Sequence, residues 1–339
     1  MKKRAVKEIV LGTIGTGPIV RSILAGVART DGIRLSAVYS RSQEKGRALA
    51  SEHNVKKVYT DLVDLMHDSE VNFIYIASPN NLHFPQAHMA LSHGKHVLCE
   101  KPLTPEKEQL ETLMRLADEQ GLLLLEAVPT PYLPNFQLLK KQLPRVGRVR
   151  LVLCNYSQYS GRYDALLAGE LPNVFSLDHA GGCLQDINYY NVYLNIALFG
   201  EPQNATYYPN RRTGQADTSG IMVMQYDDFV SSCAAAKDTW GENQVLIEGE
   251  QGYIQVKGGS NGLAEIRVVT RSADQTFNEQ PDSDRWFYEM QEITRLVLAQ
   301  KYDILARNMA ITRSVVDVME KARLAAGIIF TAKNIKTCR

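Results

Sequence analysis

The sequence has few cysteines and no excess of charge of either sign. Five cysteines are spread over 339 residues without a Cys-x-x-Cys pair. They are Cys99, Cys154, Cys183, Cys233 and Cys338. Their odd number and wide spacing argue against a disulfide framework and favour reduced thiols in a cytoplasmic protein. Because 38 basic residues balance 37 acidic ones, the chain lacks the basic stripe that tracks phosphates, which argues against nucleic acid as a partner.

The chain also lacks an apolar run long enough to span a bilayer, so no membrane partner is expected. Its first residues, MKKRAVKEIVLGTIGTGPIV, are basic and then apolar, as in a signal peptide. However, Lys7 and Glu8 delay the apolar run, glycines interrupt it, and Arg21 ends it without a small-residue cleavage site. We therefore expect a cytoplasmic protein. Its 45% hydrophobic and 22% charged residues are typical of a folded chain.

Residues 8–126 alternate short apolar runs with amphipathic stretches. The runs EIVLGTI, IRLSAVYS, VNFIYIAS, KHVLC and LLLLEA are typical of buried parallel strands. Helical spacing occurs between them at residues 19–29, 42–53, 85–92 and 105–120. Repeated β-α-β units predict an α/β fold, with a doubly wound parallel sheet of the Rossmann type over residues 1–126.

The period changes in residues 127–339, for which we predict a second, α+β domain. Helical patterns cover residues 131–143, 182–199, 284–299 and 309–328. Alternating apolar runs separated by turn residues, such as NQVLIEGEQGYIQVKG, predict a largely antiparallel sheet. At roughly 150 residues per domain, two domains also suit the length.

A glycine motif, Gly12-Thr-Ile-Gly15-Thr-Gly17-Pro-Ile-Val20, follows the first strand and opens a helix. Gly15 and Gly17 allow a tight turn, and the free N–H groups of the helix attract a pyrophosphate. Val20 replaces the third small residue of the dinucleotide fingerprint, and a plain strand-to-helix turn is the alternative. The predicted pyrophosphate loop comprises Gly15, Thr16, Gly17, Pro18 and Ile19.

The second strand ends in Tyr39-Ser40-Arg41-Ser42, where an NAD site usually has a carboxylate for the ribose hydroxyls. The Ser40 hydroxyl and the Arg41 guanidinium can instead hold a 2′-phosphate, which favours NADP(H) over NAD(H). The alternative is that Arg41 is a solvated loop charge.

Two later strands also end in polar motifs. Ser78-Pro79-Asn80-Asn81-Leu82-His83 and Cys99-Glu100-Lys101-Pro102 are expected in the crevice beyond the carboxyl ends of the strands. Further cofactor contacts are therefore expected from Ser78, Pro79, Asn80, His83, Glu100 and Lys101. The spacings of His83, His88, His93 and His96 do not match a helical zinc site, so no metal is expected.

The segments GTIGTGPIV, SPNNLH, GKHVLCEKPLT and GGCLQDINYYNVYLNIALFGEP, in this order, resemble the Gfo/Idh/MocA family of nicotinamide-dependent oxidoreductases. YSGRYDALLAGELPNVF is similar to its branch containing glucose-fructose oxidoreductase and dimeric dihydrodiol dehydrogenase. The resemblance implies a C-terminal domain whose open sheet forms the interface of a homo-oligomer, a dimer or tetramer.

The resemblance also implies the catalytic residues. Lys101 matches the family's lysine near nicotinamide and substrate, where a fixed cation polarises a carbonyl. Asp186 and Tyr190 match an Asp-x-Gly-x-His or Asp-x-Gly-x-Tyr motif, although Asn188 replaces its glycine and puts the fit at Asp186 in question. Tyr190 is the candidate acid/base, since a neighbouring ammonium such as Lys101 would lower the pKa of its phenol. The alternative for Tyr190 is a core aromatic.

Three further residues are candidates for substrate contact. The stretch from Glu126 to Pro134 lacks a basic residue, so Tyr132 or Asn135 is expected to line the pocket, unless the stretch is only a proline-rich hinge. His179 precedes two glycines and is either a substrate contact or an exposed loop residue.

These residues favour an NADP(H)-dependent oxidoreductase acting on a hydroxyl or carbonyl of a sugar, polyol or cyclic diol. The alternatives are a dinucleotide-binding regulator of the same fold without turnover and a reductase of a different unsaturated substrate. The presence of both Lys101 and Tyr190 favours an enzyme.

Overall fold

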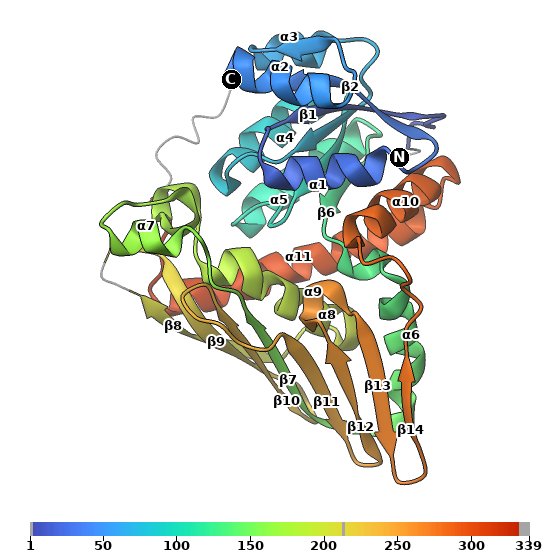
Figure 1. Cartoon of the computed structure of the whole chain (residues 1–339), viewed down its shortest axis with the longest axis vertical. Helices are drawn as coiled ribbons and strands as arrows, with labels where there is room; N and C mark the ends of the chain where they lie inside the picture. The colour runs from blue at the N-terminus through green and yellow to red at the C-terminus, as the bar shows by residue number, and fades with distance from the viewer. Residues whose placement is uncertain (1–2, 212–213, 332–339) are drawn as a thin grey trace. The chain divides into compact units, whose positions relative to one another are not determined.

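The computed structural model describes residues 3–211 and 214–331 (Figure 1). The described chain divides into two compact units. The first contains the residues up to Pro129 together with Asp284–Ala310, and the second contains Thr130–Ser283 together with the residues from Ile311 onward. No helix of the described residues is long and apolar enough to cross a membrane.

The first unit is built on a parallel sheet of six strands in the order β3-β2-β1-β4-β5-β6. The strands are β1 (Ile9–Ile14), β2 (Ile33–Tyr39), β3 (Lys57–Tyr59), β4 (Phe73–Ile76), β5 (His96–Glu100) and β6 (Leu124–Ala127). Strands β1, β4, β5 and β6 are buried along their whole length, as their apolar sequences predict. This order is that of the Rossmann fold, so the predicted fold class is confirmed.

Helices connect the parallel strands of the first unit. They are α1 (Pro18–Val27), α2 (Gln43–Glu52), α3 (Leu62–His67), α4 (His83–Ser92) and α5 (Lys107–Glu119), with a 3-10 turn, η1, at Asn80–Leu82. The short elements β3 and α3 were not predicted, because three and six residues are too few for a clear period.

A late segment of the chain completes the first unit. Helix α10 (Arg285–Leu298) packs on α1 so closely that a Cβ added to Gly26 would lie 2.8 Å from the Trp286 carbonyl oxygen. The Arg29 guanidinium lies 4.1 Å from the centre of the Phe287 ring. The predicted boundaries place residues 284–310 in the second domain, whereas the structure packs them against the first, because the apolar face of α1 needs a partner.

The second unit contains an eight-stranded sheet in the order β14-β13-β12-β11-β7-β10-β9-β8. The strands are β7 (Val149–Ser157), β8 (Asn204–Arg211), β9 (Asp217–Gln225), β10 (Val230–Ala236), β11 (Gln244–Gly249), β12 (Gly252–Lys257), β13 (Glu265–Thr270) and β14 (Asp274–Phe277). All neighbours are antiparallel except β7 and β10, which are parallel and pair Ala235 with Tyr156. The predicted largely antiparallel sheet is thus confirmed.

Short helices surround this sheet. They are η2 (Thr130–Tyr132), α6 (Pro134–Gln142), η3 (Leu143–Val146), α7 (Tyr163–Leu167), η4 (Asn173–Phe175), η5 (Leu177–His179), η6 (Leu184–Asn188), α8 (Tyr189–Phe199) and α9 (Gly259–Gly262). Helix α11 (Tyr302–Ala325) begins earlier than predicted and contains the point where the two units divide. The helix predicted over residues 182–199 starts as a π-helix, η6, before α8 continues it.

A row of buried asparagines fixes α8 to the sheet. Asn188 Nδ2 donates to the Cys233 carbonyl at 3.0 Å, and Asn191 Nδ2 donates to the Ala234 carbonyl at 2.9 Å. Asn191 Nδ2 also donates to Asn188 Oδ1 at 3.0 Å, while its own Oδ1 accepts from Ser260 Oγ at 2.6 Å. Because buried amides without partners are costly, these bonds hold α8 at one register on the sheet.

Candidate functional site

A cavity of about 560 Å³ lies in the first unit, at the carboxyl ends of β1, β2 and β4. It is lined by Ile14, Gly15, Thr16, Tyr39, Ser40, Arg41, Ser42, Lys45, Ala77, Ser78, Pro79, Leu82 and Gln86. Six of the predicted cofactor residues are therefore brought together, namely Gly15, Thr16, Ser40, Arg41, Ser78 and Pro79. Gly17, Pro18 and Ile19 form the start of α1 and are not among the lining residues.

The loop that contains Gly15 and Gly17 has the backbone geometry that lets a phosphate group approach it closely. Gly15 has φ +120°, and a Cβ there would lie 2.8 Å from the Ala77 carbonyl oxygen. Gly17 is the N-cap of α1 and provides no side chain to cap it, and no heavy atom lies within 4 Å of where its Cβ would be. The N-terminus of α1 can therefore accept an anion, since its N–H groups and dipole favour negative charge.

The end of the cavity formed by the residues that follow β2 is cationic. Arg41 and Lys45 both line it, and none of its lining residues is acidic. Ser42 Oγ caps α2 by accepting from the Lys45 N–H at 3.3 Å, and Ser40 Oγ accepts from the Ser42 N–H at 3.2 Å. Sequence reasoning missed Lys45, because its surroundings in the sequence are those of an ordinary exposed helical lysine.

His83 joins the segments that follow β4 and β5. Its Nδ1 lies 2.9 Å from the Pro102 carbonyl oxygen and its Nε2 lies 2.8 Å from the Ser78 carbonyl oxygen. Both carbonyls accept, so a neutral ring donates to one of them, and burial lowers the His83 pKa. His83 thus supports the Lys101 segment from inside the protein. Asn80 begins the turn η1 just before it.

Glu100 and Lys101 end β5 and begin the following loop, but the Glu100 carboxyl lies in the interior. Tyr75 donates to Glu100 Oε1 at 2.7 Å. Burial raises the Glu100 pKa to about 7, and the positive charge of Lys101 opposes this rise. The charge of Glu126 also raises the Glu100 pKa, and burial together with the charge of Glu100 raises the pKa of a third buried carboxyl, Glu289. Lys101 therefore stands beside an acidic interior.

The candidates in the second unit surround η6. The Asp186 carboxylate forms a short ion pair with Lys237 Nζ, and Lys237 is buried. Tyr190 is buried, with its ring centre 5.8 Å from that of Tyr156. Single-turn π-helices such as η6 are frequent at functional sites. Lys237 is a second residue that sequence reasoning missed, because it follows a strand 51 positions away from Asp186.

Asn188, the departure from the family motif, is a core residue. Its side chain is fully buried and bonded to the Cys233 carbonyl and to Asn191. The Asn188 side chain therefore helps to hold the segment between Asp186 and Tyr190 against the sheet.

The other candidates for substrate contact, Tyr132 and His179, lie in short 3-10 turns of the second unit. Tyr132 lies in the buried turn η2, and His179 Nδ1 lies 3.1 Å from Ser176 Oγ. In the nearby α6, Asn135 is fully buried, and its amide donates to the Leu263 carbonyl at 2.7 Å. Asn135 is thus a structural residue.

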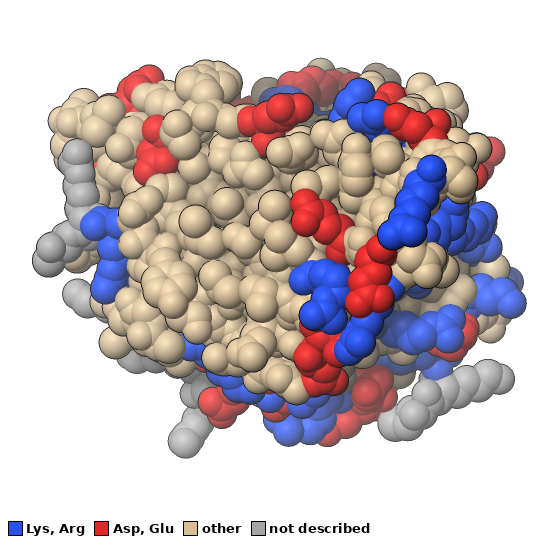
Figure 2. Space-filling view, turned by 90° about the horizontal axis from the view of Figure 1, so that it is seen from below, with Lys and Arg blue, Asp and Glu red and all other residues tan. Residues whose placement is uncertain are grey.

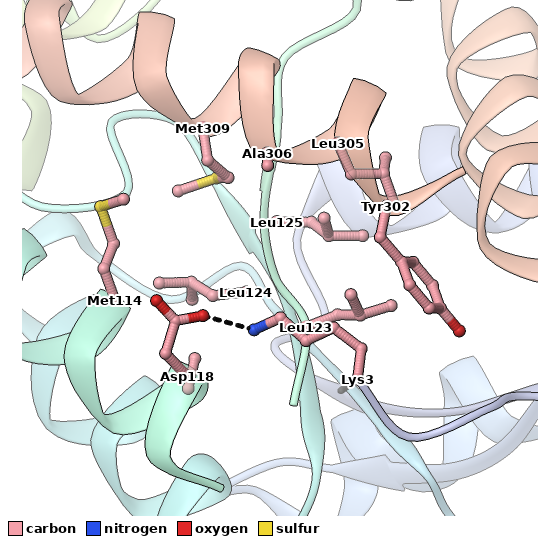
Figure 3. A pocket seen from close by; sticks show the side chains of 11 residues that line it. Lys3, Met114, Asp118, Leu123, Leu124, Leu125, Tyr302, Leu305, Ala306 and Met309 are labelled. Atoms are coloured by element: carbon pink, nitrogen blue, oxygen red, sulfur yellow. Dashed lines mark hydrogen bonds and ion pairs between the residues drawn. The ribbon is translucent and has the colours of Figure 1, made fainter. Parts of the chain in front are cut away.

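A smaller cavity of about 120 Å³ in the first unit is apolar (Figure 3). Leucine and methionine side chains from α5, β6 and α11 line it, and an ion pair of 2.7 Å between Lys3 and Asp118 lies at its side. It lacks the convergent polar groups of a reaction site. Within residues 3–211 and 214–331, no group of three His, Cys, Asp or Glu side chains is arranged to hold a metal ion.

The buried Glu100 predicts a pH-dependent stability. Because the folded state holds its proton up to about pH 7 and the unfolded state only to about 4.5, the free energy of unfolding falls as the pH rises through this interval, by about 3 kcal/mol. Glu100→Gln keeps an acceptor for Tyr75 and should remove this part of the slope in urea unfolding measured from pH 4 to 8. The exposed Glu108→Gln variant is the control, and a Glu100→Gln slope equal to that of the wild type would contradict the assignment.

Comparisons with known proteins agree with this geometry. The model of the family "Oxidoreductase family, NAD-binding Rossmann fold" matches residues 9–127. A scyllo-inositol 2-dehydrogenase (NADP(+)) of Bacillus subtilis is 33% identical over 322 residues, covering 94% of this chain and 97% of the relative. A trans-1,2-dihydrobenzene-1,2-diol dehydrogenase of Xenopus tropicalis is 23% identical, covering 87% and 90%.

Solved structures show the same fold. A 3-ketoreductase from Actinomadura kijaniata, in complex with NADP and TDP-benzene, is similar with a TM-score of 0.82 at 20% identity, covering 93% of this chain and 98% of that one. A levoglucosan dehydrogenase with NADH and levoglucosan also has a TM-score of 0.82, at 17% identity, covering 94% and 97%. The match over nearly the whole length of a 33% identical relative shows that this chain belongs to the Gfo/Idh/MocA family of oxidoreductases.

Proposed function

We propose that this protein is an NADP(H)-dependent oxidoreductase that transfers hydride to or from a CH–OH carbon of a sugar, polyol or cyclic diol. The observation that carries the proposal is the cavity at the ends of β1, β2 and β4, whose lining includes the glycine loop that leads into α1 and two basic side chains and includes no carboxylate. The relatives named as a scyllo-inositol 2-dehydrogenase (NADP(+)) and a trans-1,2-dihydrobenzene-1,2-diol dehydrogenase, which match most of this chain, support the reaction class.

The cofactor would be held by residues of the first unit. Gly15, Thr16 and the start of α1 suit the pyrophosphate, while Ser40, Arg41 and Lys45 suit a 2′-phosphate. When bound, the nicotinamide supplies or accepts the hydride. The role of the chain is then to orient the substrate, to polarise the reacting oxygen and to move its proton.

Lys101 and Tyr190 are the proposed catalytic residues. The Lys101 cation stabilises negative charge on the reacting oxygen, and the Tyr190 hydroxyl exchanges a proton with it. Asp186, held by Lys237, binds or orients a substrate hydroxyl. Tyr132 and His179 are proposed to line the substrate pocket.

The test of this function is an oxidation assay. We expect reduced nicotinamide to form from at least one member of a panel containing scyllo-inositol, D-xylose, levoglucosan and a trans-dihydrodiol, measured by absorbance with NADP+ and with NAD+. Lys101→Ala should lower kcat by orders of magnitude and leave the Kd for NADP+ within a few fold, because the cofactor phosphates are held elsewhere. Binding of NADP+ without turnover of any member would favour a regulator instead.

The cationic end of the cavity predicts a preference for NADP(H). Arg41→Ala and Lys45→Ala should each weaken NADP+ binding by about tenfold, the worth of one charge-assisted contact of ~1.5 kcal/mol, and should leave NAD+ binding nearly unchanged. Isothermal titration measures both constants. Arg47→Ala, on the same helix but outside the cavity lining, is the matched control. Tighter binding of NAD+ than of NADP+ by the wild type would refute the preference.

The acid/base role of Tyr190 separates catalysis from packing. If its hydroxyl moves the proton, Tyr190→Phe lowers kcat by about 10²- to 10⁴-fold. If the ring serves only in the core, the change costs about 1 kcal/mol of stability and spares kcat. Tyr193→Phe, one helical turn away and fully buried, is the control. Full activity of the Tyr190→Phe protein would remove the assignment.

We further propose a cytoplasmic homodimer formed through the open face of the second unit's sheet. Neighbouring strands place Leu153, Ile221, Val230 and Tyr208 on this face, and these four side chains are 39% to 64% exposed. Figure 2 shows a broad face with few charged side chains at its centre. An apolar surface of this kind favours an isologous contact with a second copy.

The proposed cytoplasmic location is supported by the cysteines. The four described cysteines are free and buried, which suits a reducing compartment, whereas Cys338 lies outside the described residues.

The dimer is tested by charging this face. Leu153→Glu combined with Ile221→Glu should convert a dimer into a monomer, because a C2 contact brings each introduced carboxylate close to its partner's apolar surface. Light scattering after gel filtration measures the mass. The control is Leu324→Glu, which changes a similarly exposed side chain (48%) on α11. This variant should remain dimeric. A monomeric wild type would refute the proposal.

A further inference from the structure

The second unit exposes a stacked pair of aromatic rings, Tyr159 and Trp240, which we call the aromatic platform. The two rings are nearly parallel, with an interplanar angle of 8° and 5.7 Å between their centres. Trp240 is 78% exposed, although one face of its indole ring lies against Tyr159. The other face of the indole is therefore open to solvent and available for a ligand to stack on.

The platform is held by contacts that continue into the core. The Tyr159 hydroxyl donates to Asp164 Oδ1 at 2.5 Å. The Tyr159 ring stands at 90° to the Tyr163 ring, which in turn makes an edge contact with the buried Phe175. These contacts fix the orientation of Tyr159 and give Trp240 a preformed surface to stack on, so that little side-chain freedom is left to lose when a ligand binds.

Both halves of the platform lie close in sequence to residues that contact the proposed catalytic groups. Trp240 is three residues after Lys237, which pairs with Asp186. Tyr159 is three residues after Tyr156, whose ring lies 5.8 Å from that of Tyr190. Three residues span at most about 10–11 Å, so the Cα atom of each platform residue lies within that distance of the Cα atom of a residue that contacts Asp186 or Tyr190.

The parallel pairing of β7 and β10 explains this arrangement. Because the two strands run in the same direction, the segments that follow them leave the sheet at the same end. The segments are joined there by hydrogen bonds from the Gln158 N–H to the Ala236 carbonyl at 2.8 Å and from the Ser160 N–H to the Lys237 carbonyl at 2.9 Å. The platform and the Asp186–Lys237 pair are therefore parts of one continuous structure.

From this juxtaposition we propose that the aromatic platform is a substrate subsite, in which Trp240 stacks on the C–H face of a saturated, hydroxylated ring. The proposal rests on the proposed function and makes Trp240 a specificity-determining residue for ring substrates over open-chain polyols. The negative π face of an indole attracts C–H groups, while the hydroxyl groups at the rim of a sugar or cyclitol ring stay solvated. A second copy of the chain is a poorer candidate, since the open sheet face offers it a larger apolar surface.

Steady-state kinetics test the subsite on the best substrate of the oxidation panel. Trp240→Ala should raise KM by about 2- to 12-fold, the range for one aromatic contact, and change kcat by less than twofold. Trp240→Phe keeps a ring and should recover most of the loss. Leu171→Ala, which alters another exposed side chain of this unit (52%), should leave KM unchanged. An unchanged KM in Trp240→Ala would overturn the proposal, as would a change in its oligomeric mass without a change in KM.

A fluorescence titration tests binding independently of turnover. The chain has two tryptophans, Trp240 and Trp286, so the Trp286→Phe protein reports on Trp240 alone. The titration is done in buffer that contains neither NADP+ nor NADPH, so that no turnover occurs. Scyllo-inositol, D-xylose and levoglucosan should shift or quench the emission of Trp240 saturably, and sorbitol, which has no ring, should not. No change with any ring compound overturns the subsite, whether or not that compound is oxidised. Ring binding without turnover would instead refute only the proposed function.

Discussion

Parallel strand pairing is the constraint on which both candidate sites depend. In the first unit, it brings the carboxyl ends of β1, β2 and β4 to one edge, where the glycine loop, Ser40 and Ser78 meet. Among the described strands of the second unit, β7 and β10 alone pair in parallel, and the segments that follow them, with Tyr159 and Lys237, leave the sheet at the same end. An antiparallel pair would send them to opposite ends. Strand direction thus gathers the candidate residues of the first unit and the residues of the proposed subsite in the second.

Buried polar groups hold these segments in place. His83 joins the Ser78 and Pro102 carbonyls, and the asparagine row fixes α8, the helix that contains Tyr190. Each such contact restricts a segment because a buried polar atom that loses its partner costs about 1–3 kcal/mol. Rigid support of this kind keeps a reacting group at a fixed position, which is the main contribution a protein makes to hydride and proton transfer.

The charges of the first unit divide into two groups with different uses. Arg41 and Lys45 line the cavity at the ends of β1, β2 and β4, where their charges can attract an anionic ligand. Glu100, Glu126 and Glu289 are buried, and burial favours the protonated form of Glu100 and Glu289. Lys101 follows Glu100 in the chain, and its positive charge interacts with the Glu100 carboxyl. The unit therefore presents positive charge to a cofactor without exposing the carboxyls that would repel its phosphates.

Local sequence determined the elements whose signals are local. The apolar runs gave the strands of the first unit, since a fully buried strand needs apolar side chains on both faces. Gly15 was predicted from the glycine motif that follows the first strand, and its φ of +120° beside the Ala77 carbonyl agrees with a position that suits only glycine. Ser40 and Arg41 were predicted because the residue at the end of the second strand meets the ribose.

Tertiary structure alone decided what depends on contacts between distant residues. The packing of α10 on α1, the burial of Asn188 and the pairing of Asp186 with Lys237 each join positions 45 or more residues apart. Lys45 and Trp240 have ordinary sequence surroundings, and only the fold shows that one lines a cavity and the other stacks on Tyr159. The physical reason is that periodicity and turn chemistry act over a few residues, whereas burial and charge pairing depend on which segments the folded chain brings together.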